Sequence, residues 1–344
     1  MSVSVVVGGQ YGSEGKGKVA HHLAAQRDAA AAIRVGGPNS GHSAVDACGQ
    51  LKVLRVLPTA ALLPDVLCLL GPGSYVDSDQ LLREVEEIGI APERLVVDAN
   101  AFVVTDDDRL AERDARLSER IGSTGSGTGA AVARRVARCG TPTLARGDQR
   151  LAPFVGDAVA RARELCDRGA RVVVEGTQGF GLSLLHTPQW PKATSRDVTA
   201  AAAVAEAGLS PLDVDEVAVV LRAFPIRVAG NSGPMGAEEL TWDQVAEEAG
   251  LPSGLVERTS VTAKIRRVSR FDPEIVRRAL MVNRPNLVVM NHLDYVDGQA
   301  AAIGEPTGRV LAFVQDVEDR IGCRIDLLGF TPAGLVPRVA SPAP

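Results

Sequence analysis

Residues 8–18 (GGQYGSEGKGK) combine two features that bind phosphate groups, a glycine-rich backbone and positive charge. Five glycines let this backbone approach a ligand and direct N–H groups at anionic oxygens, and two lysines add cations. The pattern Gly12-x4-Gly17-Lys18 fits a P-loop, although Val19 stands where a Ser or Thr hydroxyl would hold magnesium. The alternative is a glycine-rich turn between a strand and a helix, with two solvated lysines.

Two further loops carry groups suited to nucleotide chemistry. Residues 36–42 (GGPNSGH) contain His42, which is either a general acid or a cap on the following segment. Residues 122–129 (GSTGSGTG) place hydroxyls and backbone N–H groups before a basic helix expected at 130–138, which suits a second phosphate. A flexible Gly/Ser linker is the other interpretation of this loop.

Polar residues also follow expected strands. Residues 175–179 (EGTQG) come after a strand at 171–174, where ligands bind in open parallel sheets, so Gln178 is a candidate to bind a base or a sugar. Asp294 follows another apolar run and would accept from a purine amino group or cap its loop. Residues 262–267 (TAKIRR) would clamp carboxylate and phosphate, or form a solvated basic patch.

The segments that would position these loops alternate between strand and helix patterns. Expected strands are 2–7, 32–35, 51–57, 66–70, 94–104, 171–174, 214–222, 287–290 and 325–328. Expected helices are 19–25, 77–87, 105–120, 130–138, 155–168, 198–206, 241–249 and 307–321. This alternation, without a linker or repeat, predicts one α/β domain over residues 1–344 with a mainly parallel central sheet. Residues 335–344 are expected to be a loosely ordered tail.

Composition narrows the function classes. A chain of 344 residues with 45% hydrophobic residues can bury a large core. A net charge of −5 gives no general attraction to nucleic acid or to an anionic membrane, so local basic groups must hold any phosphate. The five scattered cysteines predict reduced thiols, and no apolar run reaches membrane length. We therefore expect a cytoplasmic protein that binds neither nucleic acid nor membrane.

Seven blocks in this order resemble the adenylosuccinate synthetase family and span residues 3 to about 330. They are Gly12-x-Glu14-Gly15-Lys16-Gly17-Lys18, Asn39-Ser40-Gly41-His42, 124–129, 175–179, Thr194-Ser195, 262–267 and Leu293-Asp294. The resemblance implies a P-loop NTPase-like fold and a homodimer. It also implies the family's reaction, in which a nucleoside triphosphate phosphorylates the 6-oxygen of a purine monophosphate. The amino group of L-aspartate then displaces that phosphate, with Mg2+ as cofactor.

The resemblance also implies a role for each matching residue. Ser13, Lys16 and His42 would be catalytic, and Ser13 and Gly41 would contact the metal. The triphosphate would be bound by Gly12, Glu14, Gly15, Lys16, Gly17, Lys18, Gly41, His42, Ser43, Arg266, Asn291 and Asp294. The purine monophosphate would be bound by Ser13, Asn39, Ser40, Thr124, Gln178, Thr194, Lys264 and, from a second subunit, Arg138. L-Aspartate would be bound by Thr262 and Lys264.

One position departs from the family in a way that bears on the substrate. Ser13 stands where the family has an aspartate that takes the N1 proton of hypoxanthine and helps to bind magnesium. A serine hydroxyl is no base near neutral pH, but its small size leaves room for the 2-amino group of guanine. This pattern is similar to the bacteriophage branch that converts dGMP and aspartate into 2-amino-2′-deoxyadenylosuccinate, the precursor of diaminopurine DNA, in the host cytoplasm.

Two alternatives stand beside this prediction: an ordinary adenylosuccinate synthetase acting on IMP, and a non-catalytic nucleotide-binding regulator. The phosphate donor is likewise open. His292 replaces a family lysine beside the guanine of GTP, which makes ATP or dATP a candidate as well as GTP. Lys264 replaces a family arginine and would bind a carboxylate through charge without a bidentate fork.

Overall fold

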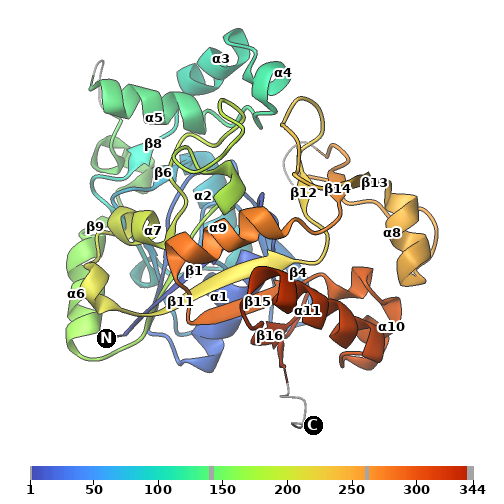
Figure 1. The fold of residues 1–344 in the computed structure, drawn as a ribbon. Coiled ribbons are helices and arrows are strands. Elements are labelled where there is room, and N and C mark those ends of the chain that lie inside the picture. The colour runs from blue at the N-terminus through green and yellow to red at the C-terminus, as the bar shows by residue number, and fades with distance from the viewer. Residues whose placement is uncertain (1, 139–142, 260–262, 339–344) are drawn as a thin grey trace.

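A ten-stranded sheet forms the centre of the computed structural model, which describes residues 2–138, 143–259 and 263–338 (Figure 1). The strand order is β17 (Val336–Pro337), β16 (Leu327–Leu328), β15 (Leu287–Asn291), β11 (Val214–Arg222), β1 (Val3–Gly8), β10 (Val172–Glu175), β2 (Ala31–Arg34), β5 (Leu67–Leu70), β7 (Leu95–Asp98) and β9 (Val155–Gly156). Neighbouring strands are parallel except β16 and β17, which pair antiparallel.

The central strands are buried along their whole length because helices cover both faces of the sheet. All six residues of β1 are buried, as are all four of β10 and of β2. Val5 and Val7 face one side, which packs against α7 (Ala200–Ala207), α9 (Pro273–Asn283) and α11 (Gly308–Ile321). Val6 faces the other side, which packs against α1 (Lys16–Gln26). Burial on both faces explains why these strands are continuous apolar runs.

The remaining elements surround the sheet (Figure 1). The helices are α2 (Ser78–Ile88), α3 (Asp106–Asp114), α4 (Leu117–Ile121), α5 (Thr128–Ala137), α6 (Ala158–Asp167), α8 (Trp242–Ala249) and α10 (Gly298–Ile303). A small antiparallel sheet consists of β12 (Ile226–Arg227), β14 (Arg267–Ser269) and β13 (Glu239–Leu240). Two short pairs are formed by β3 (His42–Val45) with β4 (Leu51–Leu54) and by β6 (Tyr75–Val76) with β8 (Phe102–Val103).

The mainly parallel α/β architecture predicted from the sequence is confirmed, but several element boundaries were wrong. The helix expected at 105–120 is two helices, because Arg116 takes a left-handed backbone conformation between α3 and α4. The helix expected from residue 155 begins at Ala158 after its cap Asp157, and β9 precedes it. The expected strand at 94–104 is divided into β7 and β8, and the strand expected from residue 51 ends at Leu54.

Two further differences lie in the C-terminal third of the chain. Helix α9 was not predicted, although Asp272 caps it and Pro273 opens it, which are recognised start signals. Residues 335–338 were expected to be loosely ordered, whereas β17 extends the main sheet and the side chain of Leu335 is buried. None of the described helices is both long and apolar enough to span a lipid bilayer.

Candidate active site

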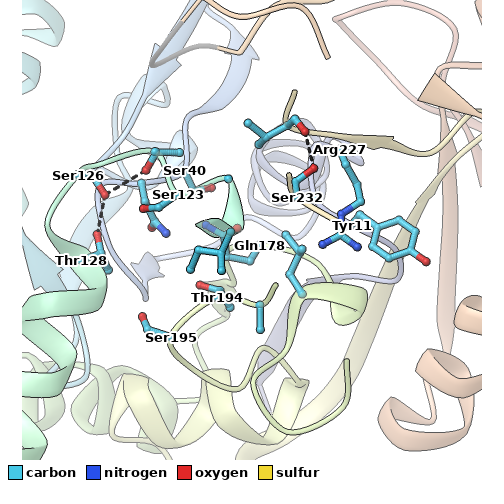
Figure 2. A pocket seen from close by; sticks show the side chains of 18 of the residues that line it. Tyr11, Ser40, Ser123, Ser126, Thr128, Gln178, Thr194, Ser195, Arg227 and Ser232 are labelled. Atoms are coloured by element: carbon cyan, nitrogen blue, oxygen red, sulfur yellow. Dashed lines mark hydrogen bonds between the residues drawn. The ribbon is translucent and has the colours of Figure 1, made fainter. Parts of the chain in front are cut away.

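A cavity of about 390 Å³ opens at the carboxyl ends of β1, β2, β10 and β11. Figure 2 shows side chains that line it. The loops after these strands form part of its wall, at the edge where parallel α/β sheets bind ligands, and residues between 112 and 129 form another part. The cavity-lining residues that were predicted from the sequence are Gly12, Ser13, Lys16, Asn39, Ser40, Gly41, His42, Thr124, Gln178, Thr194 and Arg266. Loops more than 150 residues apart in the chain therefore meet at one site.

Other predicted site residues lie outside this cavity wall. They are Glu14, Gly15, Gly17, Lys18, Ser43, Arg138, Lys264, Asn291 and Asp294. Arg138 is exposed after the last turn of α5, and Lys264 is exposed on a hairpin beside the cavity. Gly17 packs inside α1, where an added Cβ would lie 2.7 Å from the Cβ of His42. Thr262 lies outside the described residues.

The glycine-rich loop after β1 is shaped by its own carboxylate. Oε1 of Glu14 accepts hydrogen bonds from the backbone N–H groups of Gln10 (3.1 Å) and Gly12 (2.7 Å), and Oε2 accepts one from Nζ of Lys16 at 2.6 Å. Nζ of Lys18 donates to the carbonyl of Thr331. Neither lysine is thus solvated, and the interpretation of this loop as a turn with two solvated lysines is wrong.

Two cavity residues have backbone conformations that side chains disfavour. The φ angles of Ser13 and Gln178 are 56° and 65°, and both residues lie in the left-handed region. Such a conformation costs about 1–2 kcal/mol for a residue with a side chain. Strain of this kind concentrates at functional sites, where surrounding contacts hold it in place. Ser13 and Gln178 are therefore candidates for side chains whose direction is held for contact with a ligand.

His42 is held from behind by a buried carboxylate. Its Nδ1 lies 2.5 Å from Oε1 of Glu175, which also accepts a bond from Nη1 of Arg34 at 2.9 Å. Burial, with the nearby Arg34 guanidinium, lowers the pKa of His42 to about 3, although Glu175 acts to raise it. The ring is therefore neutral and donates Nδ1–H to the carboxylate. Nε2 is buried and has no hydrogen-bond partner within the described part of the chain.

The second glycine-rich loop presents a row of hydroxyls to the cavity (Figure 2). Oγ1 of Thr124 donates to Oγ of Ser126 (3.3 Å), which lies 3.0 Å from Oγ1 of Thr128. The sequence also predicted that amides at the start of the next helix would be available to phosphate. Two of these amides are already engaged, because Oε1 of Glu112 accepts the N–H groups of Gly129 (2.8 Å) and, more weakly, Ala130 (3.4 Å). The hydroxyls remain available.

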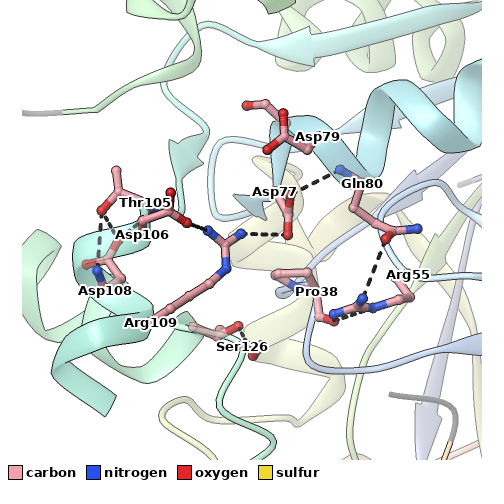
Figure 3. A network of polar contacts seen from close by, with 12 residues as sticks. Pro38, Arg55, Asp77, Asp79, Gln80, Thr105, Asp106, Asp108, Arg109 and Ser126 are labelled. Carbon is pink, nitrogen blue, oxygen red and sulfur yellow. Dashed lines mark hydrogen bonds and ion pairs between the residues drawn. The ribbon is translucent and has the colours of Figure 1, made fainter. Parts of the chain in front are cut away.

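Polar contacts of Arg55 and Arg109 lie beside these two loops (Figure 3). Arg55 donates to the carbonyl of Pro38 at 2.8 and 3.0 Å, which holds the loop before His42. Arg109, on α3, pairs with Asp77 and Asp106, each at 2.7 Å. A Cβ added to Gly37 would lie 2.5 Å from Cγ2 of Thr128, so the two loops touch and their spacing depends on a glycine.

A second polar cluster lies where β15 ends. Nδ2 of Asn291 donates to the carbonyl of Glu14 at 2.9 Å. Burial raises the pKa of Asp294 to about 6 and lowers that of Lys18 to about 8, with the opposite charge of each partly offsetting the effect on the other. Burial also lowers the pKa of His292 to about 3, so this ring is neutral. The hydrogen bond from Asn291 to Glu14 joins this cluster to the glycine-rich loop.

Sequence reasoning assigned no role to several charged residues that build the site. Arg34, Glu175 and Arg222 are buried, and each one ends a strand of the main sheet. The sequence does show a single charged residue at the end of each apolar run. A charge in that position is expected to be buried and therefore to need a partner of opposite charge. Glu112 and Tyr11 also line the cavity, and they carried no comparable signal.

The cavity provides few ligand atoms for magnesium, so it fits a magnesium ion whose other ligands come from substrate phosphates and water. The described residues contain no group of three or more His, Cys, Asp or Glu side chains that could hold a metal. Glu14 is engaged by two amides and Lys16, which leaves Ser13 and the carbonyl of Gly41. Magnesium often takes most of its ligands from water and substrate phosphates, so this neutral pair is compatible with it.

The order and spacing of these loops match a known family over most of the chain. The family model for adenylosuccinate synthetase matches residues 5–146 and 142–303. The chain belongs to the adenylosuccinate synthetase family. The adenylosuccinate synthetase of Methanococcus aeolicus is 34% identical over 340 residues, which cover 96% of this chain and 97% of that protein. This protein is accordingly a ligase of the adenylosuccinate synthetase type.

Two solved structures share the fold of this family member. The succinoaminodeoxyadenylate synthetase of cyanophage S-2L, bound to dGMP and to dATP as an energy donor, is 30% identical with a TM-score of 0.81. The alignment covers 98% of this chain and 95% of that one. The fully ligated adenylosuccinate synthetase of Plasmodium falciparum is 17% identical with a TM-score of 0.83, covering 98% and 100% of the two chains, and supports the fold alone.

Proposed function

We propose that this protein joins L-aspartate to C6 of dGMP and produces 2-amino-2′-deoxy-N6-succinyladenylate for diaminopurine synthesis. The observation that carries the proposal is Ser13, an exposed hydroxyl on the cavity wall at the position of the family's aspartate. A serine leaves space beside N1 of the purine and can accept a hydrogen bond from the 2-amino group of guanine. The cyanophage enzyme, solved with dGMP, supports the same substrate.

The reaction proceeds in two steps in this proposal. The N1 proton of dGMP passes to solvent water while the 6-oxygen attacks the terminal phosphorus of a nucleoside triphosphate, which forms a 6-phosphoryl nucleotide and releases the diphosphate. The amino group of aspartate then attacks C6 and loses a proton, while the C6–O bond breaks and inorganic phosphate leaves with the oxygen. Phosphorylation is needed because a 6-oxo group is a poor leaving group. Magnesium, when bound, would neutralise charge on the transferring phosphoryl group through Ser13 and Gly41.

The chain's own residues provide positive charge and hydrogen bonds for these steps. Lys16 lies at the cavity wall, where it can exchange its contact with Glu14 for a phosphate oxygen. Phosphate charge beside His42 favours its protonated form, in which Nε2–H donates to the transferring group while Nδ1–H stays on Glu175. Thr124, Gln178 and Thr194 bind the monophosphate nucleotide. Lys264 and Thr262 approach aspartate.

An adenylosuccinate synthetase acting on IMP is the second candidate. The archaeal relative at 34% identity favours it, since that protein is named for this activity. The two candidates differ in one measurable property, the purine that is consumed. Arg138 binding across a homodimer and GTP, ATP or dATP as the donor are compatible with both candidates.

A substrate panel tests the proposal directly. Purified protein is given aspartate, magnesium and each of ATP, dATP and GTP, together with dGMP, GMP or IMP. Phosphate release and the mass of the product are then measured. We expect release with dGMP and a product heavier by the aspartyl addition. Turnover of IMP in preference to dGMP would support the second candidate and overturn the first.

A further inference from the structure

Arg222 connects the residue proposed to recognise the purine with the hairpin on the other side of the cavity. Its side chain is fully buried at the end of β11. Nη1 donates to the backbone carbonyl of Ser13 at 3.0 Å, and Nη2 donates to Oε1 of Glu257 at 2.6 Å. Gln10 bonds both the N–H and the carbonyl of Arg222, at 2.8 and 3.2 Å. Gln10 therefore holds the backbone of Arg222, while Ser13 and Glu257 hold its guanidinium.

Glu257 also binds Arg266, which lines the cavity. Its Oε2 accepts a bond from Nη1 of Arg266 at 3.1 Å, and its backbone carbonyl accepts the N–H of Arg266 at 2.9 Å. Arg258 and Ile265 form an antiparallel bridge beside this pair, so Glu257 stands at the base of a hairpin. Although burial acts to raise it, the Arg222 and Arg266 guanidinium groups hold the pKa of Glu257 well below its usual range. The carboxylate is charged.

This arrangement is geometrically rigid. A planar guanidinium bonded to a carboxylate and to a carbonyl has little freedom, and a lysine cannot reproduce the same fork. Its carbonyl partner belongs to Ser13, whose left-handed backbone needs support from its surroundings. Loss of the Arg222 contact would release the peptide that directs the Ser13 hydroxyl. The cavity contacts of Arg266 would loosen through Glu257.

We propose that Arg222 is a positioning residue for purine discrimination, because it holds the Ser13 backbone in its left-handed conformation and ties it through Glu257 to Arg266. This inference rests on one part of the proposed function, namely that Ser13 faces the purine. It applies whichever purine the enzyme consumes. A simple structural ion pair would stabilise the fold without changing the ratio of kcat/KM between dGMP and IMP.

The test uses Arg222→Lys, Glu257→Gln and Ser13→Gly, with kcat/KM measured for dGMP and IMP in each variant. For the preferred purine, we expect about a tenfold or greater loss in Arg222→Lys and Glu257→Gln. The dGMP-to-IMP ratio should move toward one in both variants. Equal losses for both purines would overturn the proposal. If Arg222→Lys does not fold, Glu257→Gln still provides the test. It leaves one acceptor oxygen but removes the charge and the second oxygen that bind Arg222 and Arg266.

A double-mutant cycle shows whether Arg222 acts through Ser13. Glycine adopts positive φ without strain, so Arg222→Lys should cost several-fold less in the Ser13→Gly background than in the wild type. Losses that multiply independently would contradict the proposal. Arg171→Lys is the matched control, because Arg171 makes a two-bond pair with Asp215 at the opposite, amino end of the strands. The purine that the wild type prefers tests the proposed function, whereas the change of that preference in the variants tests the role of Arg222. Failure of one claim can therefore be told from failure of the other.

Discussion

His42 and Glu175 form a buried pair in which Nδ1 of the ring lies 2.5 Å from Oε1 of the carboxylate. The carboxylate is itself fixed, since Oε2 accepts both the N–H and the hydroxyl of Thr59, each at 2.8 Å. This pair sets the tautomer of the ring and its orientation at the cavity wall. The sequence left two roles for His42, a catalytic group and a loop cap, and the kinetics of a variant at this position separate them.

The His42→Asn variant tests the catalytic role. Asparagine retains an N–H donor for Glu175 but has no atom in place of Nε2, so the loop should keep its shape. We expect kcat to fall by about 10²-fold or more, with a smaller change in the KM for the monophosphate nucleotide. Steady-state phosphate release measures both parameters. An unchanged kcat would assign His42 to the loop cap alone.

The lowered pKa of His42 predicts that this residue makes stability depend on pH, and that His42→Asn removes this contribution. The pKa of His42 is about 3 in the folded protein and about 6.5 in a model peptide, so the unfolded chain binds more protons between these values. The free energy of unfolding should therefore fall as pH drops below about 6.5, by at most about 1.4 kcal/mol per pH unit from this group.

Denaturant unfolding at pH 8, 6.5, 5.5 and 5 measures this effect. We expect His42→Asn to lose less unfolding free energy than the wild type between pH 6.5 and 5. The difference isolates His42 from Asp294, whose raised pKa of about 6 has the opposite sign and whose stabilisation is lost as pH rises. Parallel curves for the two proteins would mean that His42 titrates normally in the fold.

Ser13→Asp tests the size and charge requirement at the purine. The longer anion would occupy the space proposed for the 2-amino group, so kcat/KM for dGMP should fall about ten- to a hundredfold. Activity on IMP should rise or stay level, since a carboxylate can accept the N1 proton. Kinetics on both nucleotides check this, with Ser13→Ala as the control for loss of the hydroxyl. Undiminished dGMP turnover in Ser13→Asp would contradict the guanine proposal.

Arg138 tests the proposed shared site of a homodimer. The side chain is exposed beyond α5 and does not line its own subunit's cavity, as a residue reaching a neighbour would. Mixing Arg138→Ala with His42→Asn should restore activity, because a C2 heterodimer contains one site without either change. An equal mixture should reach about a quarter of the wild-type rate. Verified heterodimers without recovery would exclude the shared site.

Much of this site was accessible from the sequence because its loops follow buried strands. The apolar runs of β1, β10 and β15 predict parallel strands, and the polar residues after them predict ligand contacts at one edge of the sheet. Ser13, Asn39 and Gln178 follow β1, β2 and β10, and their position in the cavity agrees with that reasoning. The order of these blocks also carried the family resemblance without any contact information.

The partners of these residues depended on the tertiary structure. Glu175 lies under His42 because β10 pairs with β2, and Arg222 reaches Ser13 because β11 pairs with β1. Local patterns identify strands but do not determine which strands become neighbours, since that choice depends on packing between distant segments. Glu112 is a similar case, because an acidic residue within a charged helix gives no sign that it will bond to the amides of α5. Sequence thus determined which groups are present, and long-range packing determined which of them remain available to a ligand.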